Sequence, residues 1–339
     1  RATQGKIDFF REPKFVHIAQ YGRKIQMNEG VCPAYSDCRI GLSPDKFILD
    51  YCDRALGITS AEEKYILPSG NNFSLYLIEL FPHQVWKMEM TDGIRQALQE
   101  GSDSLRAYYE KAGILVARPA KGSSCTLAVS AKGGNNAENH NHNDIGSYAV
   151  ALGKCTMVGD QGGPFSYPGD YFSAEAPEKY KIKGSFGHPV PVVDGKTQSS
   201  GAKASAIVLK EFTDVKDLLS IDYTSAYSTP SLDKLVRTFV YDRQGKGSFT
   251  VGDEFTANAP IRFETAITTQ ANWKIIDDTH LLLTTGTEQM TVTIEASGKV
   301  AFTSETIEVN SPAYKRIGIS LKEQSKDGYI RLTMRTKQL

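Results

Sequence analysis

The sequence has no net charge, few cysteines and no long apolar run, and each absence excludes a class of protein. Lysine and arginine together number 39, and so do aspartate and glutamate. A balanced charge gives no overall field that would attract nucleic acid or an anionic membrane, so we expect neither partner. A local basic surface for an acidic substrate remains compatible with this balance.

Targeting and membrane segments are also missing. No run approaches the roughly 20 apolar residues that span a bilayer, and the segment RATQGKIDFFREPKF lacks the parts of a signal peptide. Because residue 1 is Arg rather than Met, we expect a mature chain or an excised fragment.

The five cysteines are scattered and odd in number, and none forms a CxxC pair. We therefore expect neither a disulfide scaffold nor a thiolate zinc site. The pattern indicates buried thiols, with Cys32 and Cys38 as the one candidate bridge.

The apolar pattern changes near Gly113 and predicts an α+β fold with two parts. In LSPDKFILDYCDRALG, Ser43 is a candidate N-cap and Phe47 begins a helical spacing of apolar residues. We predict a helical part over residues 1–112, the C-terminal end of a helical domain. After it, short runs alternate between turn signals, which predicts a large antiparallel β-sandwich over residues 113–339. YDRQGKGSF reads as a hairpin loop closed by Gly245 and Gly247.

Polar residues crowd the stretch NNAENHNHNDIGSYAV, residues 135–150, just before an apolar run. On an extended backbone, His140, His142 and Asp144 would project to one side, because successive side chains alternate. Two imidazoles on one side of a strand can offer a metal site or a general base. The alternative interpretation is a polar loop with solvated histidines and asparagines in turn conformations.

Two later segments supply candidate partners for these histidines. In CTMVGDQGGPFSY, Asp160 ends an apolar strand, and in KGSFGHPVPVVDGKTQ, His188 precedes another. His142, Asp160 and His188 would suit zinc and leave a fourth coordination position open. Each also has a structural interpretation: Asp160 as a turn acid, His188 as a packed loop histidine, and a hydrogen bond between His142 and Asp160 in place of a metal.

The order of these segments resembles the C-terminal half of the heparinase II/III-like polysaccharide lyases. That family joins an incomplete α/α toroid of helices to an antiparallel β-sandwich. The likeness extends over roughly residues 110–270, through AGILVARP, NHNHNDIGSYAVALGKCTMVGDQGG, SFGHPVPVVDGKTQ and LVRTFVYDRQGKGSFTVGDEF. NEGVCPAYSDCRIG, residues 28–41, resembles more loosely a loop after a late toroid helix.

The resemblance implies a role for individual residues. His140 matches the catalytic histidine of the sandwich, and His142, Asp160 and His188 match zinc ligands. Pro189 stands where many relatives have asparagine, which affects only the hydrogen bonding around His188.

The implied reaction is β-elimination of a uronic-acid-containing polysaccharide, in which a neutral histidine is a suitable base. The tyrosine and the asparagine or histidine that assist in this family lie on toroid helices. Their distance from CPAYSDC places them before Arg1, so we expect this chain to lack them.

Two other functions remain open: a metal-assisted glycoside hydrolase that uses zinc-bound water, and a non-catalytic glycan-binding sandwich with a structural zinc. From the resemblance we also expect a bacterial protein of the periplasm or the secreted fraction, with an acidic polysaccharide or oligosaccharide as partner. The particular uronan, endo or exo action, and the oligomeric state stay open.

Overall fold

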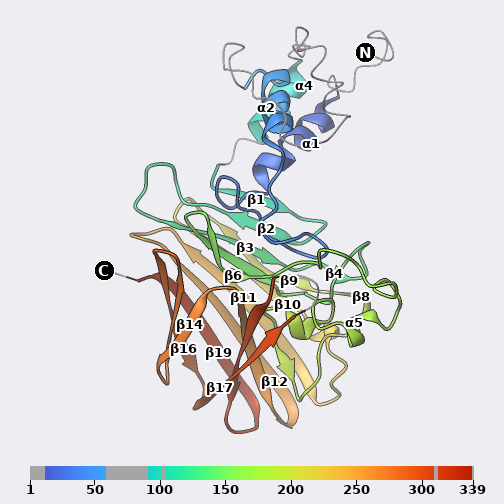
Figure 1. The fold of residues 1–339 in the computed structure, drawn as a ribbon, viewed down its shortest axis with the longest axis vertical. Coiled ribbons are helices and arrows are strands. Elements are labelled where there is room, and N and C mark those ends of the chain that lie inside the picture. Colours follow the sequence, from blue (N-terminus) through green and yellow to red (C-terminus); the bar gives the residue numbers. More distant parts are fainter. Residues whose placement is uncertain (1–11, 59–90, 101–103, 309–311, 338–339) are drawn as a thin grey trace. The chain divides into compact units, whose positions relative to one another are not determined.

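The computed structural model of the protein describes residues 12–58, 91–100, 104–308 and 312–337. The chain divides into two compact units, Arg1–Gln26 with Ser43–Ser104, and Met27–Leu42 with Leu105–Leu339. The predicted class, helices followed by large antiparallel sheets, is confirmed (Figure 1). The part of the helical prediction that falls on residues 59–90 lies outside the described residues.

The first unit contains three described helices: α1 (Pro13–Lys24), α2 (Lys46–Ala55) and α4 (Asp92–Glu100). Val16, Leu56 and Ile94 bury their side chains in one small core. The expected N-cap Ser43 was wrong. Asp45 caps α2, because its carboxylate accepts hydrogen bonds from the backbone amides of Phe47 and Ile48.

The second unit begins its strands earlier than the apolar pattern near Gly113 suggested. The segment RAYY forms β1 (Arg106–Tyr109), which pairs with β2 (Ile114–Ala117) as a hairpin. These two strands belong to a five-stranded antiparallel sheet in the order β1-β2-β3-β5-β6, completed by β3 (Leu127–Lys132), β5 (Tyr148–Leu152) and β6 (Cys155–Gly159).

An eight-stranded antiparallel sheet runs beside the five-stranded one in the order β14-β15-β16-β19-β12-β11-β10-β9 (Figure 1). Its strands are β9 (Ala206–Phe212), β10 (Lys216–Asp222), β11 (Leu232–Asp242), β12 (Ser248–Ile261), β14 (Asn272–Asp277), β15 (His280–Thr285), β16 (Glu288–Ala296) and β19 (Ser325–Thr336). The predicted hairpin between β11 and β12 is confirmed, and both Gly245 and Gly247 have positive φ angles.

Two smaller sheets complete the unit. One has the order β17-β18-β13-β7, with β7 (Val192–Val193), β13 (Phe263–Thr269), β17 (Val300–Ile307) and β18 (Tyr314–Leu321). The other pairs β4 (Asn135–Asn136) with β8 (Gly201–Ala204). Short helical turns lie in the connections: α5 (Ala176–Lys179), η2 (Ser185–Gly187) and η3 (Thr224–Ala226).

One large apolar core joins the sheets. Every residue of β5 is buried, which requires cover on both faces of the strand. On one face the ring of Tyr148 lies 6.4 Å from Phe239 of β11 and 6.0 Å from Phe249 of β12. Full burial of such side chains contributes roughly 1.5–3 kcal/mol each, so the core holds β5 and the polar loop before it firmly in place.

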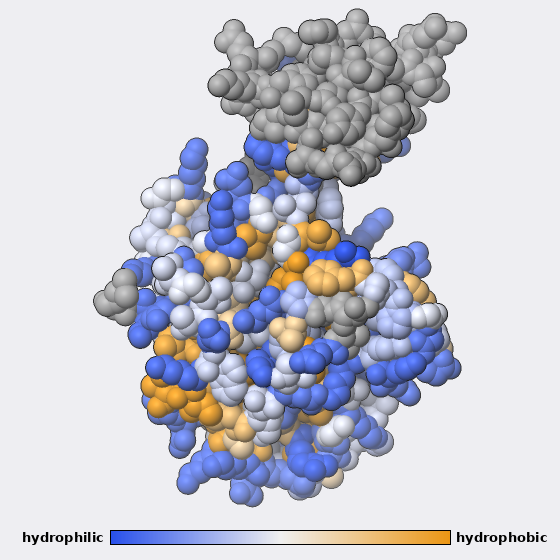
Figure 2. Space-filling view, viewed as in Figure 1, coloured by the Kyte–Doolittle hydropathy of each residue, from blue (hydrophilic) through white to orange (hydrophobic). Residues whose placement is uncertain are grey.

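The cysteines form no disulfide: all five thiols are free. The candidate bridge between Cys32 and Cys38 was therefore wrong. On the face seen in Figure 2, the coloured residues of the second unit mix hydrophilic side chains with separate apolar patches.

Candidate metal and catalytic site

Four loops of the second unit bring polar side chains to one place. They contribute His140, His142 and Asp144 from the loop between β4 and β5, Asp160 from the turn after β6, His188 from the residue after η2, and Asp37 from the segment 34–39.

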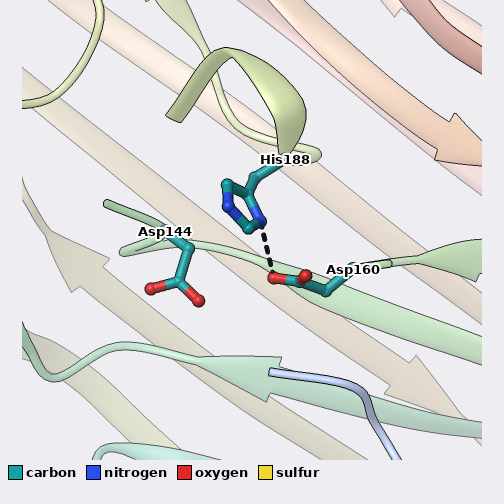
Figure 3. A group of neighbouring side chains, drawn as sticks. All are labelled: Asp144, Asp160 and His188. Atoms are coloured by element: carbon teal, nitrogen blue, oxygen red, sulfur yellow. Dashed lines mark hydrogen bonds and ion pairs between the residues drawn. The ribbon is translucent and has the colours of Figure 1, made fainter. Parts of the chain in front are cut away.

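Asp144, Asp160 and His188 lie together and are fully buried (Figure 3). One possible ligand atom from each lies within 4.8 Å of those of the other two. His188 Nδ1 is 2.8 Å from Asp160 Oδ2, and the hydroxyl of Ser147 donates to the same oxygen at 2.9 Å. Two carboxylates and an imidazole at this spacing could bind a metal ion.

Three buried polar atoms around this group have no hydrogen-bond partner among the described residues. They are Nδ1 of His142, Oδ2 of Asp144 and Nε2 of His188. A buried polar atom left unpaired costs about 1–3 kcal/mol. A cation between these side chains would satisfy such atoms, so the donor set fits a metal.

His142 packs beside this group without being one of its three members. Its ring centroid is 5.2 Å from that of His188, and its side chain is fully buried. Nε2 lies 3.1 Å from Oδ1 of Asp37 and 3.0 Å from the hydroxyl of Tyr171. Burial lowers the pKa of His142 and so favours the neutral imidazole, which is the form that binds metals.

Asp160 and His188 shift the pKa of each other, because Nδ1 of His188 contacts the carboxylate. Burial alone would raise the pKa of Asp160, but the opposing charge of His188 lowers it to about 2. Burial also opposes a charge on His188, yet the negative charge of Asp160 outweighs it and raises the pKa of the imidazole. The alternative hydrogen bond between His142 and Asp160 is not the one that forms, because His188 is the histidine that contacts this carboxylate.

His140 points away from the buried group. Its side chain is 64% exposed, and its Nδ1 lies 2.6 Å from Oδ2 of Asp37. The carboxylate of Asp37 therefore contacts His140 with one oxygen and His142 with the other. Although burial raises the pKa of Asp37, these hydrogen bonds lower it more, so the carboxylate stays ionised.

The expected extended backbone at the HxH pair was wrong. Residues 137–147 form a loop, and His140 adopts a left-handed conformation with φ of 59°. This turn places His140 at the surface while His142 and Asp144 are buried, so the three side chains do not share one side.

Asp37 reaches the site because two backbone segments pair closely. Gly163 donates its N–H to the carbonyl of Cys38, and Arg39 forms an isolated bridge with Gly162. A Cβ on Gly162 would lie 1.6 Å from the carbonyl oxygen of Cys38, and the φ of Gly162 is 69°. The two glycines after Asp160 therefore permit this approach.

The sequence did not single out Asp37 or Tyr171, and it assigned Asp144 no ligand role. Asp37 lies in the CPAYSDC segment, but no local spacing links it to residue 140. Only the paired backbone at Gly162 brings the two together.

The chain shares the fold of heparinase III. It superposes on a heparinase III structure with a TM-score of 0.61 and 15% identity, covering 95% of this chain and 45% of that one. It superposes on heparan sulfate lyase HepC from Pedobacter heparinus with a TM-score of 0.61 and 14% identity, covering 94% and 46%.

The expected resemblance to heparinase-type lyases is therefore confirmed at the level of fold, and this chain spans less than half the length of both structures. No family model matches the sequence, and no curated protein matches it significantly. Among the described residues, no helix is long and apolar enough to cross a membrane.

Proposed function

We propose that the protein is a polysaccharide lyase, or a portion of one, that cleaves uronic-acid-containing polysaccharide by β-elimination. The observation that carries this proposal is an exposed imidazole, His140, held by the carboxylate of Asp37 beside a buried group suited to a metal. The fold shared with heparinase III and a heparan sulfate lyase supports the same reaction class.

His140 is the proposed general base or acid. When Nδ1 carries a proton, it donates to Asp37, and Nε2 then keeps a lone pair for proton transfer. In the elimination, the C5–H bond breaks and its electron pair forms the C4–C5 double bond. The C4–O4 bond breaks, and the leaving oxygen takes up a proton. An exposed imidazole can reach these atoms of a bound chain, whereas the buried His142 and His188 cannot.

Zinc is the proposed metal, with His142, Asp160 and His188 as ligands and Asp144 as a neighbouring carboxylate. Unpaired nitrogens on two buried imidazoles favour zinc over calcium, which takes six to eight oxygen ligands. A bound zinc would supply a fixed cross-link between the loops of the site. Asp37 contacts both a proposed ligand and the proposed catalytic histidine, so it would orient both imidazoles.

The proposed substrate is an acidic polysaccharide of the glycosaminoglycan type, and the proposed setting is the bacterial periplasm or the secreted fraction. Both proposals rest on the resemblance in sequence motifs and on the fold shared with heparan sulfate lyase HepC.

Product analysis tests this function. Incubation of the complete enzyme with heparan sulfate should produce an unsaturated uronate with ultraviolet absorbance, and His140→Ala in that enzyme should abolish it. New reducing ends without absorbance would instead identify the metal-assisted hydrolase. Glycan binding with no product of either kind would identify a non-catalytic sandwich.

A further inference from the structure

Three large aromatic side chains are exposed on one short segment of the second unit. Phe165, Tyr167 and Phe172 have exposed fractions of 53%, 42% and 55%. Leaving such rings about half exposed to water forgoes part of the free energy that their full burial would contribute. Exposed aromatic rings gathered on one short segment are a feature of binding surfaces rather than of an inert loop.

The rings connect directly with the candidate catalytic histidine. The centroid of Tyr167 is 5.0 Å from that of Phe172, and Phe172 is 5.3 Å edge-to-face from the ring of His140. Tyr171 lies fully buried beneath them, 5.4 Å from Phe172 and 5.2 Å from Tyr167. The buried ring of Tyr171 therefore packs against two of the exposed rings and limits their movement.

Two cations accompany these rings. Arg39 donates to the carbonyl of Phe165 at 2.7 Å, and its guanidinium carbon lies 5.5 Å from the centroid of that ring. The ammonium of Lys183 lies 4.8 Å from the centroid of Phe172. Arginine provides five N–H donors in a planar fork, which suits a carboxylate or a sulfate.

Two acids of this region, Asp37 and Asp170, already have hydrogen-bond partners. Asp37 contacts His140 and His142, and Asp170 accepts hydrogen bonds from Lys179 and Tyr180. Arg39 and Lys183 therefore supply positive charge beside the rings, and the ionised carboxylate of Asp37 offsets it only in part.

We propose that Phe165, Tyr167, Phe172 and Arg39 form a binding site for one sugar of an acidic polysaccharide, next to the sugar that reacts at His140. The apolar C–H face of a pyranose would lie on the rings, and its carboxylate or sulfate would pair with Arg39. This site rests on the proposed function for the identity of its ligand. The binding site would set the direction in which the polysaccharide extends away from the cleaved bond.

Binding measured without turnover tests the site. In a His140→Ala background, isothermal titration with heparan sulfate oligosaccharides should show that Phe165→Ala and Phe172→Ala each raise Kd about tenfold, which corresponds to ~1.4 kcal/mol. Phe165→Tyr should retain the affinity, because a ring remains. Arg39→Gln should weaken binding and reduce its dependence on salt, since one ionic contact is lost.

A matched control exists on β19, where Tyr329 is 39% exposed and the guanidinium carbon of Arg331 lies 5.5 Å from its ring centroid. Tyr329→Ala should leave Kd unchanged. Because all the replaced rings are exposed, each variant should melt at the temperature of its parent.

The outcomes separate this inference from the proposed function. Unchanged affinity in the Phe165 and Phe172 variants, or no binding of heparan sulfate by the His140→Ala protein, would overturn the site. If the rings prove essential for binding but the complete enzyme with an intact His140 releases no unsaturated product, the site stands and the lyase proposal fails.

Discussion

Arg237 of β11 and Asp253 of β12 form a two-pronged ion pair in the interior, with Nε 2.7 Å from Oδ1 and Nη2 2.6 Å from Oδ2. Nη1 of the same guanidinium donates to the carbonyls of Gly146 and Pro189, both at 2.7 Å. Those residues follow Asp144 and His188 in their loops. One buried side chain therefore ties two loops of the candidate metal site to the central sheet.

Replacing Arg237 should unfold the protein more readily and disturb the site. Arg237→Ala leaves Asp253 charged and buried without its partner, which costs about 3–5 kcal/mol. Urea denaturation should show this loss. Arg331→Ala is the control, because its pair with Glu295 is half exposed and such pairs contribute about 0–1 kcal/mol. Equal urea midpoints for the two variants would contradict the interpretation.

The metal proposal predicts one zinc per chain in protein purified without chelator. Removing it with a chelator should lower the melting temperature, because a ligand that binds only the folded state stabilises it by about 4 kcal/mol when present at roughly 1,000 times its Kd. Elemental analysis and thermal melting measure both. Asp160→Ala and His188→Ala should lose the metal, and Asp144→Asn shows whether that carboxylate is a further ligand.

His280 of β15 provides the control for the metal, because it is not one of the proposed ligands although its Nδ1 lies 2.9 Å from Oδ1 of Asp277 at the end of β14. His280→Ala should keep its zinc. Substoichiometric zinc together with an unmoved melting temperature would leave only the hydrogen-bonded pair of Asp160 and His188.

The two histidines of the HxH pair should separate catalysis from metal binding. In the complete enzyme, His140→Ala should lower turnover of a uronan substrate by about 10²–10⁴-fold, as expected for loss of a general acid or base, while zinc content stays constant. His142→Ala should lose zinc. If the His140 variant kept its activity but lost its metal, His140 would be the zinc ligand and His142 the catalytic histidine.

Asp37 should affect both functions, because its carboxylate contacts both imidazoles. Asp37→Asn should weaken zinc binding by about 10–100-fold and also lower kcat. Tyr171→Phe removes only the hydroxyl that contacts His142, so it should alter zinc affinity without affecting kcat at saturating zinc. A normal kcat for zinc-loaded Asp37→Asn would show that Asp37 does not position His140.

Gly162→Ala tests the close approach that delivers Asp37. The left-handed φ of 69° alone costs a residue with a Cβ about 1–2 kcal/mol, and the clash with Cys38 adds to this. We expect a lower urea midpoint and weaker zinc binding. Gly169→Ala is the control, since a Cβ there meets no atom within 4 Å. Similar urea midpoints for both variants would mean that the segments around Cys38 and Gly162 can separate at little cost in stability.

The sequence by itself determined the class of fold and pointed to most of the polar residues that meet at the candidate site. Helical spacing before Gly113 and alternating runs after it predicted helices followed by antiparallel sheets, and glycines at 245 and 247 predicted the hairpin of β11 and β12. These features depend on local backbone preferences, which are set by residues close together in the sequence. Asp160 and His188 were also recognised as residues that belong together.

Tertiary structure decided how those residues meet. The left-handed backbone at His140 separates two histidines that the sequence places two residues apart. Asp37 joins them from a segment more than a hundred residues away, because glycines after Asp160 allow two backbones to touch. Contacts of this kind depend on long-range packing, and no periodicity in the chain encodes them.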